Sequence, residues 1–202
     1  MTRQKRYLLI LCLFLLLLAI SVIAGPHFLL YSSDYKKTDT IILLLGPDFS
    51  ARQKEAYRII NEGKSQYLII PAYRKIYKVN FEGSIKYLSP QNYLPNPNNK
   101  ISPRNSIPSF LEDTHIEIIE AKRVMSAYGL RSAIFVSSPY HMRRIKLIAA
   151  SVFDSGDSEF YFVPTSFEKA PAHFWELSWS EWKKVVREYG KILWFKIYSF
   201  WV

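Results

Sequence analysis

Short apolar runs alternate with amphipathic stretches from residue 39 to the C-terminus. Continuous apolar runs at 39–46, 66–70, 132–136 and 160–163 predict strands buried on both faces of a parallel sheet. Helical spacing of apolar residues predicts helices over 51–61, 113–128 and 142–151, and a long one from Ser178 or Ser180. This alternation predicts an α/β fold with a doubly wound, mainly parallel sheet of the Rossmann-like type.

The sequence also predicts how two of the helices begin. Ser50 is the expected N-cap of the first helix, and Thr114 with Glu117 fits a capping box at the start of the middle helix.

Residues 71–108 are rich in Tyr, Asn, Pro and Ser, with weak periodicity. A stretch of this length predicts an insertion, parts of which fold over the domain as a lid.

An apolar run at 8–24 follows Arg3, Lys5 and Arg6. It predicts a transmembrane anchor with its N-terminus in the cytoplasm, which places the following domain on the extracytoplasmic, periplasmic side of the inner membrane. The alternative is a secretory signal peptide cleaved after Ala24. The expected organisation is a cytoplasmic tip and anchor at 1–30, a tether at 31–38 and the α/β domain at 39–202.

The charge and the cysteine content of the chain limit the kinds of ligand that the domain is expected to bind. The chain has 27 basic and 17 acidic residues, a net charge of +10, and its one cysteine, Cys12, lies inside the apolar run. The exported domain therefore has no disulfide and no thiol chemistry. A basic domain beside a membrane suits anionic lipid or a phosphorylated, lipid-linked small molecule, although surface solubility also explains the charge. No nucleic-acid signature is present, and the pattern does not define an oligomeric state.

The strongest chemical pattern is Ser137-Ser138-Pro139-Tyr140-His141-Met142-Arg143-Arg144. A strand that ends in two hydroxyls, followed by a histidine and two arginines at a helix start, suits an anion. In open parallel sheets, ligands bind at the carboxyl ends of the strands. His141 is thus a candidate acid/base or a nucleophile toward phosphorus, and the alternative is a helix cap.

The turn after the first strand carries a second group. Arg52 begins the following helix and suits a phosphate or carboxylate, unless it is a surface residue. Gly46 allows close backbone approach or merely a tight turn, and Asp48 is either a site carboxylate or a turn residue. Neither G-x-G-x-x-G nor a Walker lysine is present. The predicted catalytic residues are His141, Glu117 and Glu188; the predicted ligand-binding residues are Gly46, Asp48, Arg52, Thr114, Ser137, Ser138 and Arg144.

The histidines are scattered, so the sequence predicts neither a metal site nor a cofactor. A divalent cation held by one or two carboxylates would leave no pattern in the sequence and stays open.

The chain resembles the YdcF/SanA/ElyC-like family of bacterial envelope proteins over most of residues 39–193. The match rests on the strand 39–46, on Arg52, on Thr114 with Glu117, on the His141 pattern, which resembles "Thr-Ser-x-x-His-Met-x-Arg", and on Glu188-Tyr189-Gly190-Lys191. The family pattern selects Arg144 over Arg143. The chain departs from it at Gly46-Pro47-Asp48, at Pro71-Ala72 and in the insertion.

The resemblance implies a membrane-anchored Rossmann-like protein of cell-envelope biogenesis or integrity. One member of the family has been linked to S-adenosylmethionine. The leading hypothesis is that the protein binds a phosphorylated envelope intermediate and hydrolyses a phosphoester or pyrophosphate bond. Two alternatives stay open, a non-catalytic ligand-binding or regulatory module and a nucleotide or S-adenosylmethionine binder.

Overall fold

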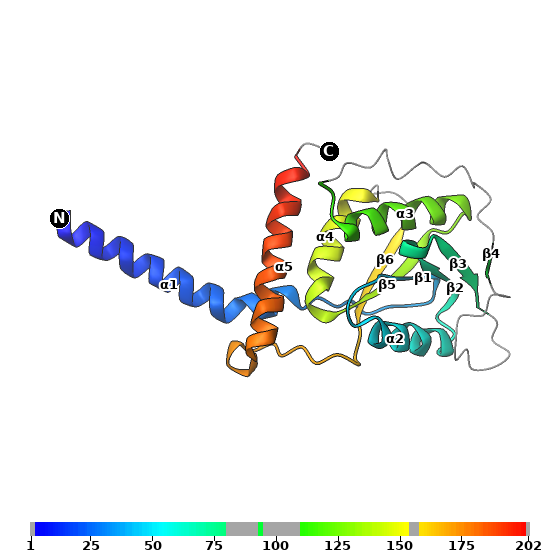
Figure 1. The fold of residues 1–202 in the computed structure, drawn as a ribbon, viewed down its shortest axis with the longest axis horizontal. Helices are drawn as coiled ribbons and strands as arrows, with labels where there is room; N and C mark the ends of the chain where they lie inside the picture. Colours follow the sequence, from blue (N-terminus) through cyan, green and yellow to red (C-terminus); the bar gives the residue numbers. More distant parts are fainter. Residues whose placement is uncertain (1–2, 80–92, 95–109, 154–157, 201–202) are drawn as a thin grey trace.

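The computed structural model describes residues 3–79, 93–94, 110–153 and 158–200, without the side chains of residues 8, 17–21, 93 and 94. Its sheet has six strands in the order β4-β3-β2-β1-β5-β6 (Figure 1). The central strands β2 (Ser65–Ile70), β1 (Thr38–Leu43), β5 (Ser132–Ser137) and β6 (Glu159–Pro164) run parallel. The strands β3 (Lys75–Lys78) and β4 (Tyr93–Leu94) extend one edge as an antiparallel pair. The predicted mixed α/β fold with a mostly parallel sheet is confirmed.

Helices cover both faces of the sheet because the strands are apolar on both sides. Ile41, Leu43 and Val136 pack against α2 (Phe49–Asn61) on one face. Ile42 and Phe135 point to the other face, which is covered by α3 (Asp113–Ala127) and α4 (Met142–Val152). The last helix, α5 (Trp179–Tyr198), packs on α4 and adds Phe195 and Tyr198 to the same core cluster (Figure 1).

Two helix starts differ from expectation. Helix α2 begins at Phe49, so its N-cap is Asp48 instead of Ser50. Helix α3 has Glu112 at its N-cap, and the predicted capping box of Thr114 and Glu117 does not form. The Glu117 carboxylate instead accepts the backbone N–H of Leu45, 3.3 Å away. This chain uses the capping-box motif at Ser178 and Glu181, where α5 begins.

The insertion is partly sheet. Pro71–Tyr73 form a 3-10 turn, and β3 and β4 follow. The alternating burial of Lys75–Lys78, with Ile76 and Tyr77 buried, fits an edge strand, which the weak periodicity of the whole insertion concealed. The rest of the predicted lid, residues 80–92 and 95–108, lies outside the described residues.

The N-terminal helix α1 (Arg3–Leu29) projects from the body as a separate rod (Figure 1). The apolar side chains that the structure describes from Leu9 to Leu16 are each more than half exposed, on every side of the helix. Over the described residues, no helix combines the length and the apolar character needed to cross a bilayer. Part of the predicted anchor, the side chains of residues 8 and 17–21, lies outside the described region, and the anchor stays a prediction.

The segment that follows α1 packs on the domain. Leu29 is fully buried, in a cluster with Tyr140 and Val185. Ser33 lies beside β6: its N–H donates to the carbonyl of Phe162 at 3.0 Å, and its hydroxyl accepts the N–H of Phe162 at 2.8 Å. The stretch predicted as a tether thus makes specific contacts with the edge of the sheet.

Candidate functional site

A cavity of about 720 Å³ opens at the carboxyl ends of the parallel strands. Strand β1 leads through α2 to β2 on one side, whereas β5 lies on its other side. Ligands of open α/β sheets bind at such a reversal of strand order, where the two strand ends leave a crevice. The turn after β1, with Gly46 and Arg52, and the turn after β5, with Ser137 and His141, both line this main cavity.

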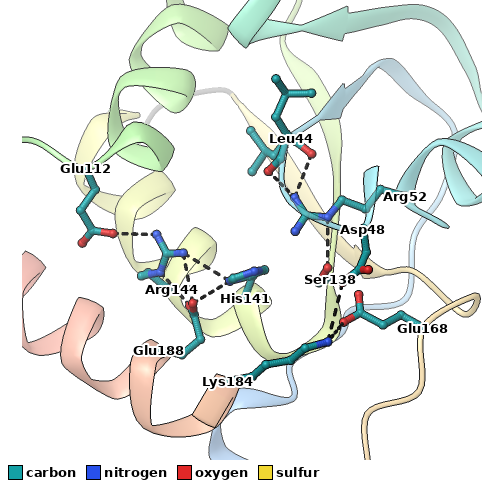
Figure 2. A network of polar contacts seen from close by, with 11 residues as sticks. Leu44, Asp48, Arg52, Glu112, Ser138, His141, Arg144, Glu168, Lys184 and Glu188 are labelled. Atoms are coloured by element: carbon teal, nitrogen blue, oxygen red, sulfur yellow. Dashed lines mark hydrogen bonds and ion pairs between the residues drawn. The ribbon is translucent and has the colours of Figure 1, made fainter. Parts of the chain in front are cut away.

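Arg52 holds the two turns together. Its side chain is almost fully buried, and its Nη1 donates to the carbonyl of Leu44 at 3.0 Å and to that of Leu45 (Figure 2). Its Nε donates to the Ser138 hydroxyl at 3.1 Å. A Cβ at Gly46 would overlap the guanidinium, which explains the glycine. Because all three acceptors are neutral, the positive charge of Arg52 is not cancelled by its hydrogen-bond partners.

Arg144 is equally buried but has charged partners. Its Nε donates to Glu188 Oε2 at 2.8 Å, and its Nη1 donates to Glu112 Oε2, also at 2.8 Å (Figure 2). Glu112 comes from the start of α3 and Glu188 from α5, so the arginine joins three helices. Two carboxylates already hold this guanidinium, which makes Arg144 a residue that positions Glu188.

Glu188 in turn orients His141. Its Oε1 lies 2.9 Å from His141 Nδ1. Burial opposes ionisation of Glu188, but the hydrogen bond and charge of His141, together with Arg144, outweigh it and lower its pKa to about 2. Burial lowers the pKa of His141, and the charges of Arg144 and Arg52 act in the same direction, against the contact with Glu188.

These shifts define the tautomer of His141. With Glu188 ionised and His141 neutral, the 2.9 Å contact favours the ring proton on Nδ1, where it is donated to the carboxylate, over a bond to that nitrogen from Arg144 Nη2, which is 3.3 Å away. The other nitrogen, Nε2, then carries the lone pair. His141 lines the main cavity and its side chain is 25% exposed. It stands at the N-cap of α4, yet its side chain makes no capping hydrogen bond, so the predicted alternative role as a cap is not seen.

Glu117 faces the same cavity from α3. Burial raises its pKa to about 7, although the Leu45 N–H and the charge of Arg52 favour the ionised form. A carboxyl group with this pKa carries its proton about half of the time at neutral pH and can donate or accept one there.

Two further cations line the main cavity, Arg74 and Lys191. Arg74 follows the 3-10 turn in a left-handed conformation, with φ 53°. Left-handed backbone is unfavourable for a residue with a Cβ. Within the described part of the chain, neither side chain makes an ion pair. Both can therefore face an incoming anion.

The structure brings most of the predicted residues together. Those that line the main cavity are Gly46, Arg52, Thr114, Glu117, Ser137, His141 and Arg144. Glu188 and Ser138 are not among the residues that line the cavity, but Glu188 contacts His141 and Ser138 contacts Arg52. Asp48 is apart from them, half exposed and 3.7 Å from Lys184 Nζ, which also pairs with Glu168 (Figure 2). This surface pairing fits its interpretation as a turn residue.

Sequence reasoning missed Glu112 and Arg74. Glu112 precedes α3 and meets Arg144 only through the packing of helices distant in sequence. Arg74 lies in the insertion, whose weak periodicity hid the short turn that points it to the cavity.

Among the described residues, no three His, Cys, Asp or Glu side chains gather at one place. Comparisons of the chain with protein-family models, with curated proteins and with solved structures found no match.

Proposed function

We propose that this protein is a membrane-anchored hydrolase of the cell envelope that acts on a phosphorylated, anionic intermediate. The observation that carries the proposal is the chain of contacts Arg144–Glu188–His141, which presents a neutral imidazole to a cavity that Arg74 and Lys191 also line. A carboxylate that fixes the tautomer of a histidine is a common device for general-base catalysis. The family resemblance and the Rossmann-like arrangement are part of the same proposal.

The reaction uses the groups in the following way. Arg74, Lys191 and the free edge of Arg52 bind phosphate oxygens. His141 Nε2 takes a proton from a water molecule while the water oxygen forms a bond to phosphorus. The bond from phosphorus to the leaving oxygen breaks, and protonated Glu117 gives that oxygen its proton. These steps use no cofactor, and they are compatible with a divalent cation bound to the phosphate.

The proposed membrane localisation rests on the N-terminal helix. The run at 8–24 is apolar, three basic residues precede it, and its described side chains are exposed on all sides of a helix that leaves the body. Such a helix suits lipid far better than water. We therefore place α1 in the inner membrane, with the N-terminus in the cytoplasm and the α/β domain outside.

The test is turnover by the full chain in detergent or vesicles. Phosphate release from a polyprenyl pyrophosphate is measured for wild type, His141→Ala and Glu188→Gln. We expect kcat to fall by about 10²–10⁴-fold in both variants, since each removes the oriented base. The matched controls are His173→Ala and Glu176→Gln, two exposed residues away from the cavity, which should behave as wild type.

Full activity in His141→Ala would contradict the proposed mechanism. Ligand binding that persists in His141→Ala, with no turnover of any phosphoester by wild type, would instead favour the non-catalytic module. The nucleotide alternative has less support, because the Arg52 guanidinium lies against Gly46, where dinucleotide-binding folds seat the pyrophosphate on the backbone of a glycine-rich turn.

A further inference from the structure

Helix α5 carries an exposed apolar stripe that the catalytic proposal does not use. Its members are Trp179, Val186, Tyr189, Leu193 and Ile197, with Phe200 just beyond the helix end, and their exposed fractions range from 36% to 86%. Their spacing of three, four or seven residues places them on one side of the helix. The buried residues Glu188 and Phe195 lie on the opposite side of α5, against the domain, whereas Val185 is buried beside the stripe in the cluster with Leu29 and Tyr140.

The stripe faces the side from which α1 leaves. Tyr189, in the middle of the stripe, donates its hydroxyl to the carbonyl of Gly25 at 2.9 Å, and its ring stacks on Phe28. Val186 and Leu193 flank Tyr189 by about one turn on either side. In Figure 1, α5 runs across the end of α1 and stands between that rod and the sheet. A membrane that holds α1 would thus meet α5 along its stripe.

A basic row begins at the edge of the stripe. Lys183, Arg187 and Lys191 follow one another at four-residue spacing, and the row winds from the stripe edge at Lys183 to the domain side of α5 at Lys191, four residues before the buried Phe195. Arg187 and Lys191 line a second groove of about 490 Å³, together with Trp194 and the start of α3. Lys191, Asp113 and Thr114 also line the main cavity, so the two hollows adjoin. The row therefore leads from the edge of the stripe to the candidate site.

We propose that α5 lies in the headgroup layer of the bilayer that α1 enters, so that the main cavity opens at the level of lipid phosphates. The apolar stripe rests on the acyl chains, Lys183 and Arg187 face the lipid phosphates, and Lys191 continues the row into the main cavity. An apolar face bordered by lysine and arginine is characteristic of helices that lie in this layer. The substrate class is then a phosphate or pyrophosphate on a membrane lipid, which enters through the second groove. This inference rests on the proposed function for its substrate and on the α1 anchor for its geometry.

The position of α5 can be measured without any activity. The full chain with Cys12→Ser receives either Leu193→Cys, in the stripe, or Asn61→Cys, an exposed position at the end of α2. Each cysteine is labelled with a polarity-sensitive fluorophore, and the protein is reconstituted into phosphatidylethanolamine–phosphatidylglycerol vesicles with lipid spin-labelled near the headgroup end of the acyl chain. We expect quenching and a blue shift at position 193 and neither at position 61.

Protein that floats with the vesicles but shows no quenching at position 193 would overturn the inference and leave the anchor intact. Disulfide cross-linking of Leu193→Cys between copies, without quenching, would overturn it in favour of a dimer interface. A chain that does not float would contradict the anchor and this inference together. Absence of turnover in wild type would contradict only the proposed reaction, because quenching is read independently.

The entry route has its own readout. Leu193→Ser should lower kcat/KM on a polyprenyl pyrophosphate in vesicles by about tenfold and leave hydrolysis of a water-soluble aryl phosphate unchanged. Equal rates of wild type and variant on the lipid substrate would overturn the route.

Discussion

The candidate site has two halves, each built on a buried arginine, and they differ in charge. Around Arg52 the acceptors are two carbonyls and a hydroxyl, so a positive charge is left at the cavity. Around Arg144 the partners are the carboxyl groups of Glu112 and Glu188, so this guanidinium is already paired. In Figure 2, His141 lies between the two arginines.

This difference separates the two tasks of a hydrolase. The half with Arg52, extended by Arg74 and Lys191, can attract and hold an anion. The half with Arg144 has no spare charge for an anion but keeps Glu188 ionised and His141 oriented. Both arginines lie in the first turn of a helix that follows a strand, a place that sequence patterns assign to ligand binding, yet their partners give them different roles.

Removal of each arginine is expected to have unequal effects on stability. Arg144→Met removes the guanidinium that two buried carboxyl groups, Glu112 and Glu188, share, so we expect the free energy of unfolding to fall by about 3–5 kcal/mol. Arg52→Met removes hydrogen bonds to neutral acceptors only, and a loss of about 1–3 kcal/mol is expected. Urea denaturation of the full chain in detergent would measure both. An equal loss in the two variants would contradict the distinction.

A substitution at Gly46 also tests the half of the site that is built on Arg52. Gly46→Ala places a methyl group where the guanidinium lies, so either the turn or Arg52 must move. We expect a loss of about 1–3 kcal/mol in the free energy of unfolding, as in overpacked cores. Gly190→Ala is the matched control, since a Cβ there meets open space within α5, and it should stabilise the helix slightly. A Gly46→Ala variant as stable as wild type would mean that Arg52 does not hold this turn.

The fold was largely predictable because its signals are local. Apolar runs such as 132–136 identify strands that are buried on both faces, and Ser178 with Glu181 marks the start of α5. Where two local interpretations competed, tertiary contacts decided. Glu117 could have capped α3, but its carboxylate reaches the turn after β1 instead, a contact 72 residues away in sequence.

The candidate site was only half predictable, for a related reason. The pattern around His141 located the cavity, but the burial of a side chain and its partner in space cannot be inferred from residue type. Arg144 was expected to hold a ligand, and the structure gives it Glu112 and Glu188, which come from helices 32 and 44 residues away. No sequence pattern pointed to Arg74, since its position depends on its own left-handed backbone conformation after a short turn.

The pH dependence sharpens the same comparison. Burial raises the pKa of Glu117 to about 7, above the value of 4.5 for an exposed glutamate. Between these values the unfolded chain has an ionised Glu117 while the folded chain keeps the proton, so stability decreases as the pH rises through this window. Glu117→Gln has no ionisable group at this position, so its free energy of unfolding should not show this decrease with pH. We expect the variant to gain about 1–3 kcal/mol relative to wild type between pH 5 and pH 8, measured by urea denaturation at each pH.

The same variant bears on catalysis. If Glu117 donates a proton in the reaction, the activity of wild type falls above about pH 7, and the small remaining activity of Glu117→Gln lacks this alkaline limb. Glu120→Gln, on the same helix and at the edge of the same cavity, should keep the limb. An alkaline limb that persists in Glu117→Gln would assign the acid to another group.

The smallest expected effect concerns Arg74, which extends the Arg52 half. Arg74→Gly removes the strain of the left-handed backbone, so the free energy of unfolding should rise by less than about 1 kcal/mol, whereas Arg74→Ala keeps the strain and should not gain it. Both variants remove the same charge from the main cavity and should weaken pyrophosphate binding by a similar factor, about fivefold. Thermal denaturation and calorimetric titration of the full chain measure the two quantities. If both variants bind pyrophosphate as wild type does, Arg74 does not belong to the anion-binding half, and Arg52 and Lys191 alone carry that role.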